Sequence, residues 1–91
     1  MKELQRICKA LGNPRRMAIM QMLLRRRELS VGTIAGMLKI SLAATSKHLT
    51  MLTNLDLLEK RQESLVVFYS IPERASPLVR QVLQLLRSTL P

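Results

Sequence analysis

The stretch Leu29–Leu58, LSVGTIAGMLKISLAATSKHLTMLTNLDLL, determines the fold that we expect for this chain. Its apolar residues recur at helical spacing in two segments, Val31–Leu38 and Leu42–Leu55, with a short turn between them. Ser30 and Ser41 stand immediately before these segments, where a serine hydroxyl accepts a hydrogen bond from an otherwise unpaired backbone N–H. Two capped helices joined by a tight turn form a helix-turn-helix, which presents one helix end to a groove in duplex DNA.

The charge of the chain favours the same kind of partner. Fifteen Lys and Arg residues against six Asp and Glu residues give a formal net charge of +9 at pH 7. Such an excess favours an anionic partner, which can be nucleic acid, an acidic lipid surface or an acidic protein. Together with the helix-turn-helix, the charge predicts that the partner is double-stranded DNA.

Composition bounds the rest of the molecule. The length predicts one domain over residues 1–91, and 47% of the residues are hydrophobic, a surplus that predicts burial against a second copy. No apolar run approaches the roughly 20 residues that span a bilayer, and the N-terminal segment is too polar for a signal peptide. The one cysteine, Cys8, excludes an internal disulfide. We therefore expect a reduced, soluble, cytoplasmic protein with no membrane partner.

Two further helices are expected before the helix-turn-helix. Helical spacing predicts a first helix over Lys2–Leu11 and a second over Arg15–Arg27. Gly12 is expected to supply a left-handed cap at the end of the first helix. Asn13 is expected to cap the second, and Pro14 suits its first turn.

After residue 56 the apolar spacing changes from that of a helix to that of a strand. Leu57–Arg61 and Leu65–Ile71 are predicted to pair as a hairpin with its tip at Gln62–Ser64, and a last helix is predicted over Glu73–Leu90. The predicted fold is therefore mainly α with a small β-hairpin. It is a winged helix-turn-helix of five helices and a two-stranded wing.

Four segments of the chain resemble a known family, in order and in spacing. They are Leu11–Met17 (LGNPRRM), Glu28–Gly32 (ELSVG), Ser41–Leu52 (SLAATSKHLTML) and Val67–Tyr69 (VFY). They resemble the L-G-N/D-P-x-R-L/M opening, the E-L-x-V-x segment, the recognition helix and the wing of the arsenic-repressor (ArsR/SmtB-type) transcriptional regulators. The resemblance implies a homodimer of winged-helix subunits, and a repressor that blocks transcription by occupying an operator near a promoter.

The resemblance also implies that the first and last helices pair across the two-fold axis, and both of them carry broad apolar faces. The residues expected at this interface are Leu4, Ile7, Cys8 and Leu11 of the first helix and Leu78, Val82, Leu85 and Leu86 of the last. Cys8 is expected to pack there as a small hydrophobe. The alternative is a disulfide across the axis, which needs the two Cα atoms within about 7 Å.

The outward side of the helix at residues 42–55 is expected to enter the major groove. Ser46 is placed to contact base edges, Lys47 to reach guanine or a phosphate, and Thr50 to meet a phosphate. Leu42, Ala43 and Ala44 stand where the family often has polar residues, and they can pack on thymine methyl groups. We therefore expect modest base readout that favours A·T steps, with much of the affinity from phosphates. The alternative is an ordinary surface helix.

The other predicted contacts flank this helix. His48 is expected to contact a phosphate or to pack between helices, and the wing at residues 59–67 is expected to lie on the DNA backbone. A solvated hairpin is the alternative for the wing, because Glu63 near its tip repels phosphate. The predicted DNA-contacting residues are Arg16, Lys39, Ser41, Ala43, Ala44, Ser46, Lys47, His48, Thr50, Lys60 and Arg61.

The residue types exclude other function classes. The segments that carry metal ligands in metal-sensing family members are here Glu28–Ile34, which has no cysteine, and Val79–Arg87, which has no Asp, Glu or His. We therefore expect no metal and no cofactor. No nucleophile–base pair or carboxylate cluster suggests an enzyme. The remaining alternative is a winged-helix module that binds protein or RNA without operator-specific DNA binding.

Overall fold

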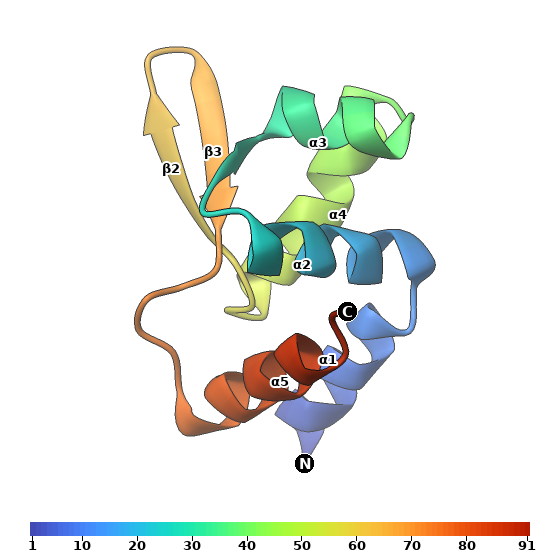
Figure 1. Ribbon diagram of the computed structural model, residues 1–91, viewed down its shortest axis with the longest axis vertical. Coiled ribbons are helices and arrows are strands. Elements are labelled where there is room, and N and C mark those ends of the chain that lie inside the picture. Colours follow the sequence, from blue (N-terminus) through green and yellow to red (C-terminus); the bar gives the residue numbers. More distant parts are fainter.

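A computed structural model describes all 91 residues as five helices and three short strands. In chain order the elements are α1 (Lys2–Leu11), α2 (Pro14–Arg25), β1 (Leu29–Ser30), α3 (Val31–Leu38), α4 (Leu42–Asn54), β2 (Glu59–Glu63), β3 (Val66–Ser70) and α5 (Pro77–Ser88). Figure 1 shows α1 and α5 at one end of the molecule and the β2–β3 wing with α3 at the other. The helix-turn-helix is therefore α3 and α4, as the sequence predicts.

The start of α2 is fixed by its local sequence. Asn13 Oδ1 accepts hydrogen bonds from the backbone N–H groups of Arg15 and Arg16 at 2.9 and 3.1 Å, and Pro14 occupies the first turn. The prediction that Gly12 is left-handed is wrong. Its φ of −71° lies in the right-handed helical region, and its backbone N–H donates to the Cys8 carbonyl oxygen, as in the helix that it follows. The helix ends at Arg25 rather than at residue 27, because the next residue is already extended and leads into β1.

Three residues other than glycine adopt the left-handed conformation, and each ends an element or makes a turn. Lys39, with φ 57°, ends α3, and Ser64, with φ 56°, forms the wing tip. Asp56, with φ 60°, lies between α4 and the wing. A left-handed conformation is uncommon for residues other than glycine, and aspartate is among the residues that tolerate it best.

The predicted two-stranded hairpin forms as β2 and β3, and the structure adds a third strand, β1, that the sequence does not predict. The three strands are antiparallel, in the order β1–β3–β2. Leu29 pairs with Tyr69 and Ser30 with Phe68, which attaches the wing to the body of the domain. A strand of two residues is too short to show an alternating pattern, and for that reason the sequence does not reveal it. The register from Glu59↔Ser70 to Glu63↔Val66 also moves the wing tip to residues 64–65.

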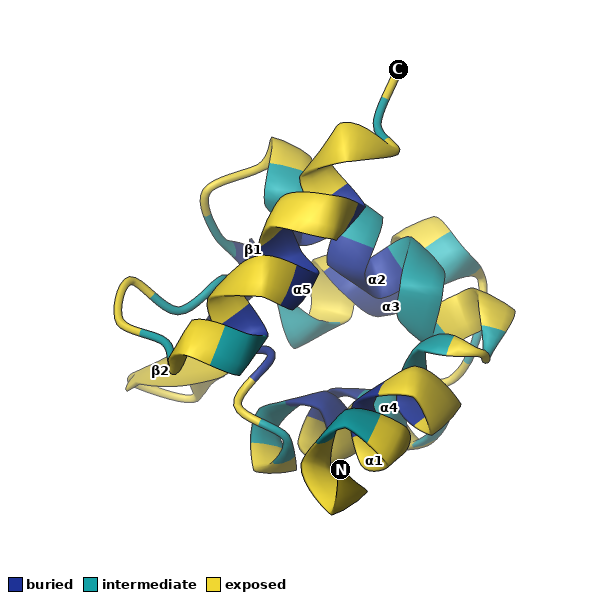
Figure 2. Ribbon diagram, turned by 90° about the horizontal axis from the view of Figure 1, so that it is seen from below, coloured by how far each residue is buried: buried dark blue, intermediate teal, exposed yellow.

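The last helix is shorter than expected at both ends. It begins at Pro77, because the Ser76 hydroxyl accepts the Val79 backbone N–H at 3.2 Å and caps it. Its buried face joins one core cluster to which every helix contributes. In Figure 2 the buried residues of α5 face the middle of the molecule while its outer side is exposed. None of the helices combines the length and the apolarity needed to cross a bilayer.

Candidate nucleic-acid interface

Helix α4 has one face in the core and the opposite face in solvent. Its buried residues are Thr45, Leu49 and Leu52, as the sequence predicts. The exposed residues of the predicted DNA-contacting set on this helix are Ala43, Ser46, Lys47 and Thr50, whereas Ala44 is half-buried. The helix contains no acidic residue, so its exposed face repels no phosphate.

The first turn of α4 is held by Ser41. Its hydroxyl accepts the Ala44 backbone N–H at 3.0 Å, and its carbonyl oxygen accepts the Thr45 hydroxyl at 2.8 Å. The Ser41 hydroxyl hydrogen remains available to a phosphate, while the oxygen acts as the cap. The predicted contact Lys39 is exposed in the turn just before this cap. An exposed cation therefore precedes the positive N-terminal end of α4 by two residues in the chain.

Arg16 and His48 connect α2 to the recognition helix. Arg16 Nε donates a 2.7 Å hydrogen bond to the Ala10 carbonyl oxygen, and Arg16 Nη1 lies 3.4 Å from His48 Nδ1. Burial, and then the charges of Arg16 and Arg15, lower the pKa of His48 below 6.5. A neutral His48 that accepts at Nδ1 carries its proton on Nε2, where it can donate. Both residues are half-buried.

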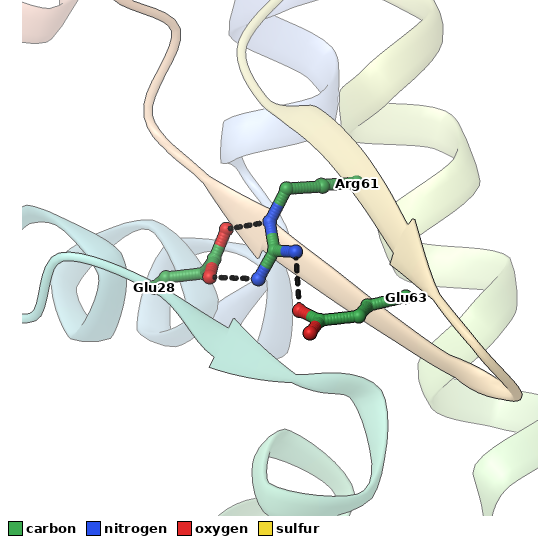
Figure 3. Close-up of polar contacts among 3 residues, drawn as sticks. All are labelled: Glu28, Arg61 and Glu63. Carbon is green, nitrogen blue, oxygen red and sulfur yellow. Dashed lines mark hydrogen bonds and ion pairs between the residues drawn. The ribbon is translucent and has the colours of Figure 1, made fainter.

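Arg61 of the wing forms ion pairs with two carboxylates, those of Glu28 and Glu63, as Figure 3 shows. Its Nε and Nη2 lie 3.1 and 2.8 Å from the carboxylate of Glu28, its Nη1 lies 2.6 Å from Glu63, and the guanidinium stacks 4.8 Å from the Phe68 ring centroid. The hydrogen bond from Arg61 lowers the pKa of Glu28, and the two carboxylates raise that of Arg61. This arrangement opposes the expected clamping of DNA by Arg61.

The remainder of the wing offers little charge to a phosphate backbone. Lys60 is exposed and makes no ion pair, so its charge is free to attract a phosphate. Glu59 and Glu63 lie on the same strand, and their negative charges repel one. The tip is apolar, because Leu65 is 94% exposed and Val66 is 42% exposed. The sequence predicts a strand that starts at Leu65, whereas Leu65 lies in the turn and the strand starts at Val66, and the spacing does not reveal that both side chains are exposed.

A basic groove of about 740 Å³ lies between α1 and α4. It is lined by Arg6, Lys9 and Ala10 of α1, by Arg16, and by Ser46, Lys47, Thr50, Met51, Asn54 and Leu55. The lining contains four cations and no acid. Arg6 and Lys9 are not among the predicted DNA-contacting residues, although their three-residue spacing places them on one side of α1.

The expected interface residues of the terminal helices fall into two groups. Ile7, Val82 and Leu86 belong to the core of the single chain, so they are not a free surface for a partner. Helical spacing alone does not distinguish an inward face from an outward one, which explains this difference. The other five, Leu4, Cys8, Leu11, Leu78 and Leu85, are half-buried or exposed.

Comparison with known proteins gives a consistent result. The sequence profile of the bacterial regulatory proteins of the arsR family matches residues 13–60. The transcriptional activator HlyU of Vibrio cholerae is 39% identical over 80 residues, which are 88% of this chain and 70% of HlyU.

The structure contains no group of three or more His, Cys, Asp or Glu side chains that could hold a metal ion.

Solved structures extend the comparison to the whole fold. A structure of HlyU from Vibrio cholerae superposes with a TM-score of 0.79 at 36% identity, and the match covers 96% of this chain and 90% of that one. The homodimeric winged helix-turn-helix DNA-binding domain of a possible ArsR-family regulator from Mycobacterium bovis superposes with a TM-score of 0.75 at 30% identity, covering 96% of this chain and 77% of that one. The chain therefore belongs to the ArsR family of bacterial regulatory proteins and is a winged helix-turn-helix transcriptional regulator.

Proposed function

We propose that the chain acts as a homodimer that recognises an operator in duplex DNA by inserting the N-terminal half of α4 into the major groove. The observation that carries this proposal is the exposed face of α4, which is free of acids, begins at a capped N-terminus and belongs to a chain of charge +9. This partner requires the protein to act in the cytoplasm, where bacterial DNA lies.

Base readout in this proposal is limited and partly apolar. Ser46 and Lys47 are the polar groups near base edges, whereas Leu42, which is 58% exposed, and Ala43 suit thymine methyl groups. Phosphate contacts then supply most of the affinity. With roughly six to eight such contacts across a dimer, affinity falls by about three to five decades between 50 and 200 mM salt.

The dimer forms through the apolar side of the terminal helices that the single chain leaves uncovered. This surface comprises Leu4, Cys8, Leu11, Leu78 and Leu85. The relative from Mycobacterium bovis is homodimeric, which supports the same assembly here. A two-fold axis at the terminal helices presents two copies of α4 to successive major grooves about 34 Å apart.

The wing has a smaller part than the family resemblance implies. Lys60 remains available to the DNA backbone, while Arg61 holds the wing to Glu28. We also propose that DNA binding does not require a metal ion, because the segments at residues 28–34 and 79–87 carry no thiolate, imidazole or paired carboxylate ligands. Equal affinities with chelator and with added zinc are the expected result.

The direction of regulation follows from the position of the operator. We predict repression where the operator overlaps a promoter, although the relative from Vibrio cholerae is named an activator. A promoter–reporter fusion measured with and without the protein tests this prediction. Expression that rises with the protein on such a promoter contradicts it.

The test of the proposed function is DNA binding by the full chain, measured by fluorescence anisotropy on its own upstream DNA with random duplex as competitor. Lys47→Ala is expected to lower the specific affinity about tenfold, because one good contact to a base edge is worth about 1–3 kcal/mol. The control Arg87→Gln removes an exposed charge of α5, far along the chain from α4. Equal effects of the two variants, or equal affinity for RNA, would count against the proposal.

A further inference from the structure

Helix α1 has two different flanks on either side of its buried face. Ile7 and Ala10 are buried and define the face toward the core. At helical spacing, one flank carries Leu4, Cys8 and Leu11, which are the apolar residues assigned above to the dimer. The flank on the other side carries Lys2, Arg6 and Lys9, all exposed. The helix therefore separates an apolar surface from a basic one.

The basic flank forms one wall of the groove that the exposed face of α4 completes. Arg6 and Lys9 line it from α1, and Lys47 and Thr50 line it from α4. None of its cations takes part in an ion pair, because both ion pairs of the chain belong to Arg61. Uncompensated cations in a concave surface concentrate positive potential and attract an anion. The apolar residues of the lining, Ala10, Met51 and Leu55, suit contact with the carbon atoms of a sugar.

We propose that this groove holds the sugar–phosphate backbone of the operator on the side of each half-site that lies nearest the two-fold axis. This inference rests on the proposed function, because it takes duplex DNA as the partner. If the apolar flank of α1 faces the partner subunit, its basic flank lies between that axis and α4. Arg6 and Lys9 then contact inner phosphates, which fix the register of the protein on DNA and carry no sequence information.

The groove also gives Arg16 a place in the interface. The Arg16 guanidinium is held at the Ala10 carbonyl oxygen and beside His48, so it is positioned before DNA arrives. Ser46, Lys47 and Thr50 belong both to the groove and to the outward face of α4. The groove therefore continues the recognition surface toward the centre of the operator.

The test compares two double variants of the full chain with equal loss of charge. Arg6→Gln with Lys9→Gln removes the basic wall, whereas Arg80→Gln with Arg87→Gln removes two exposed cations of α5 that lie outside the groove. For the groove pair, four lost contacts per dimer are expected to reduce the slope of log K against log salt by about 3 to 4 and the affinity at 150 mM salt by about tenfold or more. For the α5 pair, the slope is expected to change by less than about 1.

The position of the contacts gives a second measurement. Neutral methylphosphonate linkages at the inner phosphates of the operator are expected to weaken binding of the wild-type chain and to leave the groove variant unaffected. Equal slopes for the two double variants, or no sensitivity to the inner linkages, would overturn this inference. If Lys47→Ala still weakens operator binding in that case, the proposed function stands and only the inference fails. A wild-type chain that does not bind duplex DNA would overturn both.

Discussion

At the scale of single residues, Arg61 shows how a contact distant in the sequence changes the role of a side chain. The pattern of the wing suggests a phosphate clamp, but the carboxylate that holds this arginine comes from Glu28, which lies 33 positions away. Arg61 is half exposed, so these ion pairs add little to stability. Their consequence is that the Arg61 guanidinium is not free to bind a phosphate.

Release of Arg61 is therefore expected to strengthen DNA binding. In Glu28→Gln combined with Glu63→Gln, one freed arginine per subunit increases the salt slope of binding by about 2. The control is Glu59→Gln combined with Glu73→Gln, which makes the same change of charge on residues without an ion pair. A slope that increases equally in both double variants would show that only net charge matters.

His48 predicts how stability depends on pH. Its pKa in the folded chain lies below the unfolded value near 6.5, so the unfolded chain binds more protons in the window between the two values. Neutral His48 therefore gives its full contribution above pH 6.5, and that contribution is lost as the pH falls through this window. Thermal unfolding of the wild type and of His48→Gln from pH 7.5 to pH 5 tests this. The difference in stability between them is expected to shrink as the pH falls, and a constant difference contradicts it.

Local chemistry explains which residues the sequence predicts well. The caps Asn13, Ser30 and Ser41 are confirmed, because each one bonds backbone groups two or three residues away. Arg61 and the groove residue Arg6 are not predicted in their roles, because their neighbours are far away in the chain.

At the scale of elements, α5 carries two kinds of exposed surface. At helical spacing, Leu78 and Leu85 lie on one flank of its buried face, and Arg80 and Arg87 lie on the other. Leu85 is 68% exposed in the single chain, so its side chain contributes little to the core. In the proposed dimer, the partner subunit covers this flank, which the single chain leaves partly exposed.

Leu85→Glu is expected to separate the subunits without unfolding them. A carboxylate placed in an apolar interface costs about 3 kcal/mol, or more than about a hundredfold in the Kd of the dimer. Analytical ultracentrifugation measures this Kd, and Gln84→Glu introduces the same charge one position away on the exposed surface. A dimer that survives Leu85→Glu but not Gln84→Glu would place the interface elsewhere.

The helices are the elements that the sequence predicts best, since an apolar stripe with a cap is a local signal. The bounds of α1 and α3 are confirmed without change. The two-residue β1 is missed, because pairing with Phe68 and Tyr69 defines it rather than any pattern of its own. The predicted start of α5 at Glu73 is too early, because Ser76 caps the helix and Pro77 is its first residue.

At the scale of the whole molecule, charged and apolar surfaces lie on different sides of the terminal helices. Cations line the side of α1 and α4 that faces the proposed DNA, and apolar side chains remain on the other flank of α1 and on α5. The sequence predicts the charge and the apolar surplus, but only the packing of the helices shows on which side each lies. In the proposed dimer, two subunits joined at the apolar surface are expected to present their basic surfaces on the same side.

The most direct test of this account is the footprint of the protein on an operator selected from random duplex DNA. We expect enrichment of a two-fold symmetric sequence, with two protected major-groove segments about 34 Å apart, and loss of this protection with Leu85→Glu. Protection of a single asymmetric segment, or binding without any enriched sequence, would contradict the claim that a dimer presents two recognition helices to DNA.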